Sequence, residues 1–515
     1  MRYRFNYLPV HMALLHTGRV LALGGSGQDP RYLHSPHPAE IWDPETGHTK
    51  ILDQRPGGDV FCAGHDYLAD GRLLIAGGTF QYDGRFLGLP LPPFRGLEHT
   101  YIFDPVQERW SRDRDMATGR WYPTLITLGD GRVLAVAGFT KHFPYAFLTM
   151  LEIYAPSEGW QRLDGANRSM PLYPRLHLLP NGEVFYSGSF NTHYTYPFAI
   201  TGFPTAALNV QTREWRTIGL PERYHREEGA AILLPLLPPE YRAQVLLVGG
   251  GTHGGTSAVS DAEIIEPAAP DARWMLAPPM KHARYHVYPV ILPDRQILVI
   301  GGQGGEKHGH PPAHPPEGPP VNGPPGRGQP EIDARHDGDV TSAAADEHTI
   351  PHDPHAVLEP EVFNCENRYW TTMAPMQVDR LYHSNALLLP DGRVMAAGSN
   401  PARGINELRI EIYHPPYLFK GPRPEITQAP AAIPYGQAFE IEAADDITEV
   451  ALIRPAATTH CLTTSRYVGL PFSLLGANRI VAVVPPNKNL APPGYYMLFV
   501  VRQGIPSKAK FVQLQ

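Results

Sequence analysis

Cysteine, charge and long apolar runs are all scarce in this chain. Its 515 residues include only three cysteines, Cys62, Cys365 and Cys461, which can form at most one disulfide and exclude a disulfide-stapled scaffold. No stretch reaches the roughly 18 apolar residues that a membrane helix needs, so we expect no membrane span. Charged residues make up 18% of the chain, with 44 basic against 51 acidic side chains. Because there is neither a basic excess nor a long Lys/Arg run, we expect no nucleic-acid partner.

The first residues, MRYRFNYLPVHMALL, also lack an uninterrupted apolar segment followed by a cleavage pattern. They therefore predict no signal peptide. Gly and Pro, by contrast, are abundant, with 49 and 56 residues. Neither residue is tolerated inside long helices, whereas 42% apolar residues are enough to build a core. The composition predicts an all-β protein with many short strands and turns.

One motif recurs seven times: an apolar run follows an Asp-Gly or related turn and ends at Gly. The copies are HTGRVLALGG (16–25), ADGRLLIAGG (69–78), GDGRVLAVAG (129–138), PNGEVFYSGS (180–189), RAQVLLVGGG (242–251), PDRQILVIGG (293–302) and PDGRVMAAGS (390–399). Each predicts two strands joined by a tight turn, and a further strand with a late Trp often follows. This pattern is typical of kelch blades. We predict a seven-bladed β-propeller over residues 1–420.

Two segments depart from the repeat. Residues 304–355 are rich in Pro, Gly and His, and predict a disordered insertion between strands of the sixth blade. His308, His310 and His314 in this insertion could bind metal, although a solvated loop is the simpler interpretation. Residues 421–515 contain short alternating strands separated by proline-rich turns, and predict an immunoglobulin-like β-sandwich.

Equivalent positions in the blades of a propeller meet around its axis. Counting back nine residues from the turn glycine, or its equivalent, gives one residue in each of five blades: Cys62, Tyr122, Tyr173, His286 and His383. Tyr285 and Tyr382 precede two of them. Two imidazoles with one or two phenolates suit a copper(II) site, and a thiol beside a phenol allows a covalent redox cofactor. The plainer interpretation is that these side chains line an ordinary channel.

Four motifs carry a resemblance to a known family. GGDVFCAG around Cys62, GRWYPT around Tyr122, RLYHSNALLLPDGRV around Tyr382 and His383, and TTHCLTTSRYVGL around His460 resemble the copper radical oxidases, the family of galactose oxidase and glyoxal oxidase. The resemblance covers nearly the whole chain and implies a kelch propeller followed by an early-set immunoglobulin-like domain. The RWYPT form is closer to the glyoxal-oxidase-like members.

The resemblance also implies roles for single residues. Tyr122 would be a copper ligand joined by a thioether to Cys62, and it would carry a radical. Tyr382 would be the axial ligand and the base, while His383 and His460 would be the imidazole ligands. The partners would be dioxygen, which becomes hydrogen peroxide, and a small alcohol or aldehyde, with carbohydrate as a further option. We expect a monomer; members of the family are usually exported.

The sequence departs from the family at one position. The site of the stacking tryptophan of galactose oxidase is Thr140 here, and Phe139, His142 and Phe143 are candidates to cover the site instead. Tyr173, Tyr285 and His286 are candidate pocket-wall residues, and Cys461 is interpreted as a core residue. Since propellers serve many functions, the alternative is a non-catalytic scaffold that binds carbohydrate or protein.

Overall fold

The computed structural model describes residues 3–25, 38–81, 84–86, 89–91, 95–141, 148–191, 203–223, 226–251, 257–305, 352–400, 405–443, 446–476 and 478–515. Within these ranges the secondary structure is strand, apart from the short 3-10 helix η4 (Pro416–Phe419). The all-β prediction is confirmed. In the described part of the chain, no helix has the length and apolar character to cross a membrane.

Seven antiparallel sheets, each built on four strands, follow one another along the chain. The first four are β2–β5 (His11–Leu14, Val20–Leu23, Ala39–Trp42, Thr49–Ile51), β6, β7, β11 and β12 (Asp59–Tyr67, Leu73–Gln81, Thr100–Asp104, Arg109–Asp113), β13–β16 (Thr124–Thr127, Val133–Val136, Glu152–Ala155, Gly159–Arg162) and β17–β20 (Leu172–Leu178, Glu183–Asn191, Thr205–Asn209, Glu214–Gly219). The next two are β21–β24 (Ala230–Leu233, Val245–Val248, Ala262–Ile265, Met275–Ala277) and β25–β28 (Tyr288–Ile291, Gln296–Ile300, Glu361–Asn364, Trp370–Thr372).

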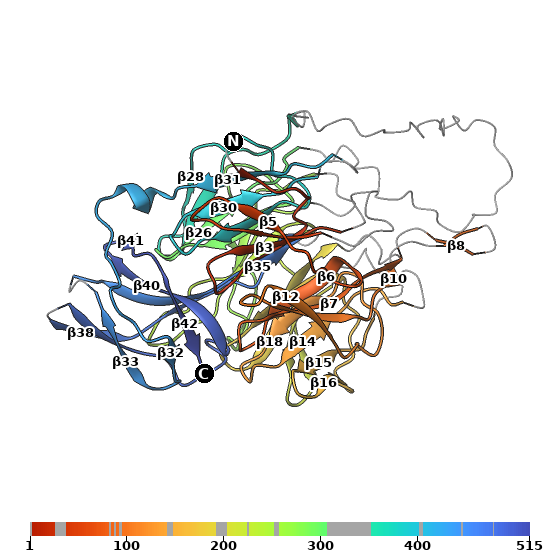
Figure 1. Ribbon diagram of the computed structural model, residues 1–515, viewed down its shortest axis with the longest axis horizontal. Coiled ribbons are helices and arrows are strands. Elements are labelled where there is room, and N and C mark those ends of the chain that lie inside the picture. The colour runs from red at the N-terminus through yellow and green to blue at the C-terminus, as the bar shows by residue number, and fades with distance from the viewer. Residues whose placement is uncertain are drawn as a thin grey trace.

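The seventh sheet closes the ring by joining the two ends of the repeat. It pairs β29–β31 (Asn385–Leu388, Val394–Ala397, Arg409–Tyr413) with β1 (Tyr3–Arg4) from the N-terminus, as the red and cyan strands of Figure 1 show. Neighbouring inner strands contact one another in the order β6, β13, β17, β21, β25, β29 and β2. The sheets therefore surround a central channel, an arrangement consistent with the seven blades predicted.

The predicted turns join the first and second strands of these sheets. Gly71, Gly131 and Gly392 occupy them with φ between 83° and 86°, a conformation that glycine adopts without a steric penalty. Second strands such as β14 and β30 are buried along their whole length, because each lies between neighbouring sheets. The fourth strands, such as β12, are partly exposed. Packing between sheets therefore builds most of the core.

Two pairings of short strands fall outside the four-strand pattern: β10 (Arg95–Gly96) extends the second sheet by pairing with β7, and β8 (Gly84–Phe86) pairs with β9 (Leu89–Leu91) in a separate hairpin. The predicted insertion 304–355 connects β26 to its neighbour β27 in the sixth sheet. Its residues 306–351, including His308, His310 and His314, lie outside the described residues.

The C-terminal part forms two further sheets, drawn in blue in Figure 1. One contains β32, β34, β37 and β40–β42 (Ala432–Ile433, Glu449–Arg454, Arg466–Gly469, Gly494–Arg502, Ile505–Pro506, Lys510–Leu514), and the other β33, β38 and β39 (Ala438–Glu442, Phe472–Gly476, Arg479–Val483). After β34, the chain forms a hairpin of β35 (Ala457–Thr459) and β36 (Leu462–Thr463). In this hairpin β35 pairs with β2, an inner strand of the ring of seven sheets. This hairpin brings C-terminal residues into the channel.

Candidate metal centre

Six of the seven sheets place one residue with a left-handed backbone in, or within two residues of, the first part of the inner strand. They include all five residues that the repeat predicts in phase, and the set is Cys62, Tyr122, Tyr173, Glu228, His286 and His383, with φ between 46° and 63°. Hydrogen bonds between backbones connect neighbours: Tyr122 N donates to Cys62 O (2.9 Å), Tyr173 N to Tyr122 O (3.0 Å) and His286 N to Glu228 O (2.7 Å). A left-handed conformation costs roughly 1–2 kcal/mol at a residue with a side chain. Such strain is characteristic of functional positions.

Glu228 is the member of this ring that the sequence analysis missed. The fifth repeat lacks Asp-Gly, and its first two strands are joined by a longer loop than the others, so that counting back from the turn fails there. A second signal would have found it. In three sheets a buried arginine stands two residues before the ring position and pairs with a buried glutamate of the third strand: Arg120–Glu152 (2.8 Å), Arg226–Glu263 (3.0 Å) and Arg284–Glu361 (2.7 Å).

The hairpin from the C-terminal sandwich delivers His460 into the ring. His460 lies at the turn between β35 and β36, is 1% exposed, and has a φ of 44°. Strand β35 pairs with β2 through Met12 and Thr458. The side chain of Thr459 adds a hydrogen bond from its Oγ1 to the Val10 carbonyl (3.0 Å). The position of His460 is therefore set by strand β2 and the residue that precedes it, Val10.

The four residues expected to bind metal meet at one point. The Tyr122 hydroxyl lies 2.8 Å from the Tyr382 hydroxyl and 3.1 Å from His460 Nε2. His383 Nε2 lies 3.0 Å from His460 Nε2. The His383 ring stacks on the Tyr382 ring, with centroids 3.8 Å apart. Two phenol oxygens and two imidazole nitrogens are thus gathered from three separate parts of the chain.

The hydrogen bonds of Thr459 determine which nitrogen of His460 is available. Its hydroxyl donates to Val10, so its oxygen accepts from His460 Nδ1–H, 2.7 Å away. The lone pair is then on Nε2, which faces Tyr122 and His383. Burial, followed by the neighbouring His383, lowers the pKa of His460 well below its usual range, so that the ring is neutral. A neutral imidazole with its lone pair directed at the other donors is the form that binds a metal.

The donor set also indicates which kind of metal fits. Among the described residues, no three His, Cys, Asp or Glu side chains form a metal-binding group, so a purely acidic or cysteine-rich site is not found there. Two imidazole nitrogens with two phenol oxygens are the mixed N/O donors that suit copper(II). The residues present fit a copper ion.

Cys62 lies directly beside Tyr122. A hydrogen bond from Tyr122 N to Cys62 O (2.9 Å) joins the two backbones, and each of the two side chains contributes to the pKa shift of the other. Burial raises the pKa of the Cys62 thiol and of the Tyr122 phenol well above their ordinary values. The geometry therefore brings together the two groups that a thioether would join.

Trp121 is a second residue that the sequence analysis did not assign to the site. Its ring stacks on Tyr122 with centroids 3.9 Å apart and planes within 8°, and Tyr173 stacks on Tyr122 at 4.4 Å. Since two nearly parallel rings this close cannot share one face, Tyr122 lies between them. Phe139, a candidate cover, lies one ring further away and stacks on Trp121 at 5.7 Å. His142 and Phe143 fall outside the described residues.

The other predicted pocket residues divide into two groups. His286 lies beside the metal ligands, with its ring 4.9 Å from that of Tyr382 and its Nε2 3.1 Å from Glu228 Oε2. Tyr285 instead donates to Gln303 Oε1 at 2.8 Å. Cys461 is buried and its thiol contacts the Glu228 carbonyl at 3.5 Å, in keeping with a core residue.

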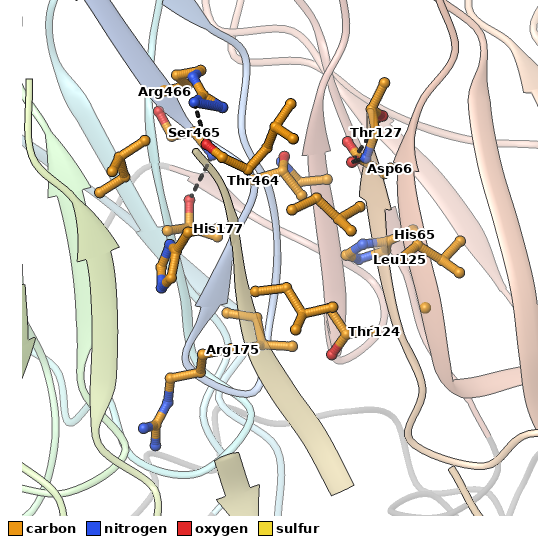
Figure 2. A pocket seen from close by; sticks show the side chains of 18 of the residues that line it. His65, Asp66, Thr124, Leu125, Thr127, Arg175, His177, Thr464, Ser465 and Arg466 are labelled. Carbon is orange, nitrogen blue, oxygen red and sulfur yellow. Dashed lines mark hydrogen bonds between the residues drawn. The ribbon is translucent and has the colours of Figure 1, made fainter. Parts of the chain in front are cut away.

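A separate cavity of about 70 Å³ lies between the hairpin and the inner strands β6, β13 and β17 (Figure 2). Polar side chains line much of it, including His65, Thr124, Arg175, His177 and Arg466. Burial and the two arginines lower the pKa of His177 to about 3, and this neutral ring hydrogen-bonds to Ser187 at 2.9 Å. None of the four converging ligands is among the described residues that line the cavity. Tyr173 and Thr459 do line it, and they contact Tyr122 and His460, so the cavity borders the candidate metal centre.

The fold and the site define a ring of antiparallel sheets with a candidate metal centre, to which the C-terminal part contributes His460. A family model described as "Glyoxal oxidase N-terminus" matches residues 37–329, more than half of the chain, and one described as "Galactose oxidase-like, Early set domain" matches residues 423–514. The chain belongs to the glyoxal oxidase family. The predicted resemblance to the copper radical oxidases is confirmed.

Individual proteins support this placement. An aldehyde oxidase GLOX from Vitis pseudoreticulata is 28% identical over 98% of this chain and 94% of its own length. A galactose oxidase from Gibberella zeae is 25% identical over 92% of this chain and 63% of its own length. The solved structure of a fungal alcohol oxidase of the AA5 family, in complex with copper, superposes with a TM-score of 0.76 at 20% identity, covering 99% of this chain and 98% of that one. At this identity, the structural match supports the fold.

Proposed function

We propose that this protein is a copper radical oxidase that oxidises primary alcohols or aldehydes and reduces dioxygen to hydrogen peroxide. The observation that carries the proposal is the convergence of the Tyr122, Tyr382, His383 and His460 donor atoms beside the Cys62 thiol. In a chain of the glyoxal oxidase family, this set is what such an oxidase requires. Copper, when bound by these four side chains, supplies the one-electron redox partner of a tyrosine radical.

Tyr122 is the proposed radical residue. A thioether to Cys62 would make its phenol easier to oxidise, because the sulfur donates electron density to the ring. Trp121 and Tyr173 cover the two faces of that ring and keep water from it. Phe139 supports Trp121 from behind. The stack would prolong the life of the radical between turnovers.

Tyr382 is the proposed base. Its hydroxyl shares a hydrogen bond with that of Tyr122, so that the proposed base lies directly beside the proposed radical residue and could take the proton of a substrate hydroxyl bound between them and the metal. An aldehyde presents the same group when it is hydrated. The two electrons and two protons that leave the substrate pass to dioxygen, which forms hydrogen peroxide.

His286 is the proposed substrate-positioning residue next to this base. Glu228 holds its imidazole at 3.1 Å, and the ring contacts Tyr382. A polar substituent of the substrate bound there would place its hydroxyl against Tyr382. Small aldehydes would need only the space beside His286 and Tyr382. We therefore expect glyoxal, methylglyoxal and glycolaldehyde to be oxidised faster than galactose.

Copper loading in air, followed by intact-mass measurement and peptide mapping, tests the proposal. We expect the loaded protein to be lighter than its sequence by two hydrogen atoms, with one linked peptide that contains Cys62 and Tyr122. A coupled peroxide assay with the four substrates then identifies the reaction. Recovery of both peptides unlinked, together with no peroxide, would favour the non-catalytic scaffold instead.

A further inference from the structure

The backbone around Cys62 departs from the regular strand. Strand β6 pairs evenly with β7 from Ala63 to Tyr67, but the register shifts between Asp59 and Ala63. Cys62 lies in this bulge, has a φ of 63° and is completely buried. A bulge removes backbone groups from the sheet ladder, and buried groups must then find other partners.

Specific groups satisfy the backbone atoms of Phe61 and Cys62 within this bulge. Phe61 N donates to Asp59 Oδ1 (2.9 Å), and Phe61 O accepts from Thr79 Oγ1 (3.0 Å). Cys62 O accepts from Tyr122 N (2.9 Å). Cys62 N donates to Nε2 of His11, 3.2 Å away on strand β2. The amide of the cysteine is thus held by a histidine from the neighbouring sheet.

His11 is well placed for this task. It is 1% exposed, so that its ring is fixed by packing, and the ring of His65 contacts it edge-on at 5.1 Å. Because Nε2 accepts a hydrogen bond, its lone pair is directed at the Cys62 amide. Strand β2, which carries His11, also pairs with the hairpin that carries His460. One strand therefore fixes both the cysteine and a metal ligand.

We propose that His11 is a positioning residue for the Cys62–Tyr122 thioether. Its Nε2 holds the Cys62 backbone in the left-handed bulge, which would keep the thiol facing the ring carbon that it must reach beside the Tyr122 hydroxyl. When the bond forms, the Cys62 S–H bond and that ring C–H bond break and one S–C bond replaces them. The two electrons and two protons pass to dioxygen, which leaves as hydrogen peroxide. This inference rests on the proposed function.

Three substitutions separate the hydrogen bond from the bulk of the side chain. His11→Leu keeps the size and removes the acceptor. His11→Gln returns an amide oxygen close to the position of Nε2, whereas the shorter His11→Asn reaches only the position of Nδ1. His177→Leu is the matched control, because it removes a buried histidine of the same channel that bonds to Ser187 and not to Cys62.

The measured quantity is the rate at which the two hydrogens are lost after Cu(II) is added in air, followed by intact mass. We expect His11→Leu and His11→Asn to slow it about ten-fold or more, the effect of losing one buried hydrogen bond. His11→Gln and His177→Leu should remain near the wild-type rate. Copper affinity, measured by titration, should be retained by all four variants, since the four donors are untouched.

The outcomes are distinguishable from failure of the proposed function. If wild type forms no linked peptide, the oxidase proposal itself is wrong. If wild type forms it and His11→Leu forms it equally fast, the role of His11 is overturned. If His11→Gln and His11→Asn form the linked peptide at the same reduced rate, the role of His11 is overturned as well. This pair of variants decides the question even where His11→Leu does not fold.

Discussion

Tyr122 shows how much a single residue position can combine. Its hydroxyl contacts Tyr382 and His460, and its ring lies between Trp121 and Tyr173. Burial raises the pKa of this phenol well above its ordinary value, so that only a bound cation or oxidation of the ring would remove its proton at neutral pH. Metal binding and redox chemistry are therefore coupled at this residue, and substitutions can separate them.

Cys62→Ser separates redox chemistry from metal binding. The sulfur is not one of the four donors, so copper should still bind with an affinity close to that of wild type. Peroxide production should fall by orders of magnitude, since Tyr122 would lack the substituent that eases its oxidation. Copper titration checks the affinity, and the coupled peroxide assay checks the loss of turnover. Turnover at the wild-type rate by this variant would contradict the mechanism.

Tyr382→Phe should produce a different defect. The Cys62–Tyr122 link should still form, because neither partner is changed, and mass spectrometry would detect it. Substrate oxidation should slow by roughly 10²–10⁴-fold, the usual effect of removing a general base. An unchanged rate with the best aldehyde would assign the base to another residue.

Among the structural elements, the β35–β36 hairpin has the most direct effect on the site. It adds two strands to the sheet of β2–β5, and its turn carries His460. Thr459 fixes the orientation of the His460 imidazole. The metal centre is therefore assembled when the hairpin pairs with β2. A ligand supplied in this way depends on hydrogen bonds that lie outside the donor set.

Thr459→Val tests this dependence with almost no change of volume. The variant loses the acceptor for His460 Nδ1–H and the bond to the Val10 carbonyl. We expect copper affinity to fall about 10–100-fold, the usual cost of removing a hydrogen-bond partner of a metal-bound histidine. Thr463→Val on the paired strand is the control, and it should bind copper nearly as wild type does. Equal losses would indicate a general effect on the hairpin.

The repeat predicted much of this arrangement, for a physical reason. Each turn occupies the same height in its sheet, so that counting from it located Cys62, Tyr122, Tyr173, His286 and His383, all of which have left-handed backbones. The counting failed at Glu228 because the fifth repeat has a longer loop. The roles of His11 and Trp121 depend on contacts across sheets and on ring orientation, which spacing along the chain does not encode.

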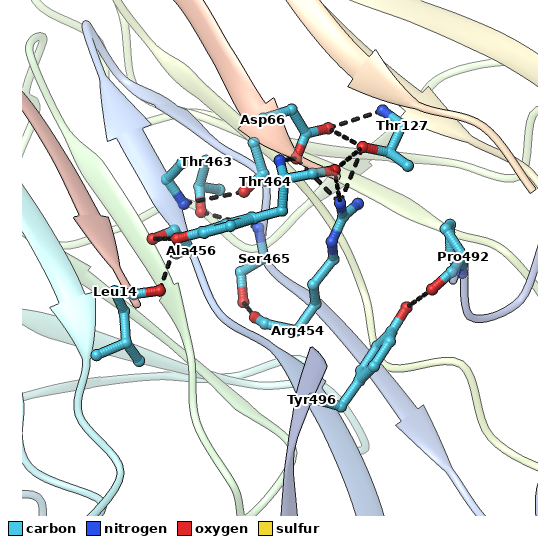
Figure 3. Close-up of polar contacts among 12 residues, drawn as sticks. Leu14, Asp66, Thr127, Arg454, Ala456, Thr463, Thr464, Ser465, Pro492 and Tyr496 are labelled. Carbon is cyan, nitrogen blue, oxygen red and sulfur yellow. Dashed lines mark hydrogen bonds and ion pairs between the residues drawn. The ribbon is translucent and has the colours of Figure 1, made fainter. Parts of the chain in front are cut away.

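At the scale of the whole molecule, the sandwich is attached to the ring by a buried polar network (Figure 3). Arg454, at the end of β34, pairs with Asp66 at 3.1 Å and donates to Thr127 Oγ1 at 2.9 Å. Asp66 also accepts from the amide and the hydroxyl of Thr127. The Tyr67 hydroxyl contacts the carbonyls of Leu14 and Ala456. The hairpin with His460 begins three residues after Arg454, so we expect this contact to orient the last of the four proposed ligands.

Arg454→Leu should therefore weaken both stability and metal binding. The side chains of Arg454 and Asp66 are 6% and 1% exposed, and loss of the arginine would leave a carboxylate buried without its partner. Breaking such a pair typically costs about 3–5 kcal/mol in the free energy of unfolding, which urea denaturation would measure. Adding Asp66→Asn should recover part of the loss, because the buried charge is then removed.

The control is Arg479→Leu, at an ion pair with Glu440 within the sandwich. Those two side chains are 50% and 57% exposed, so water screens their attraction and the loss of stability should be much smaller than in Arg454→Leu. Copper affinity should fall in Arg454→Leu, because the hairpin loses its anchor, and stay unchanged in Arg479→Leu. If the two variants lose the same stability, or if Arg454→Leu binds copper as tightly as wild type, the anchoring role of Arg454 is wrong.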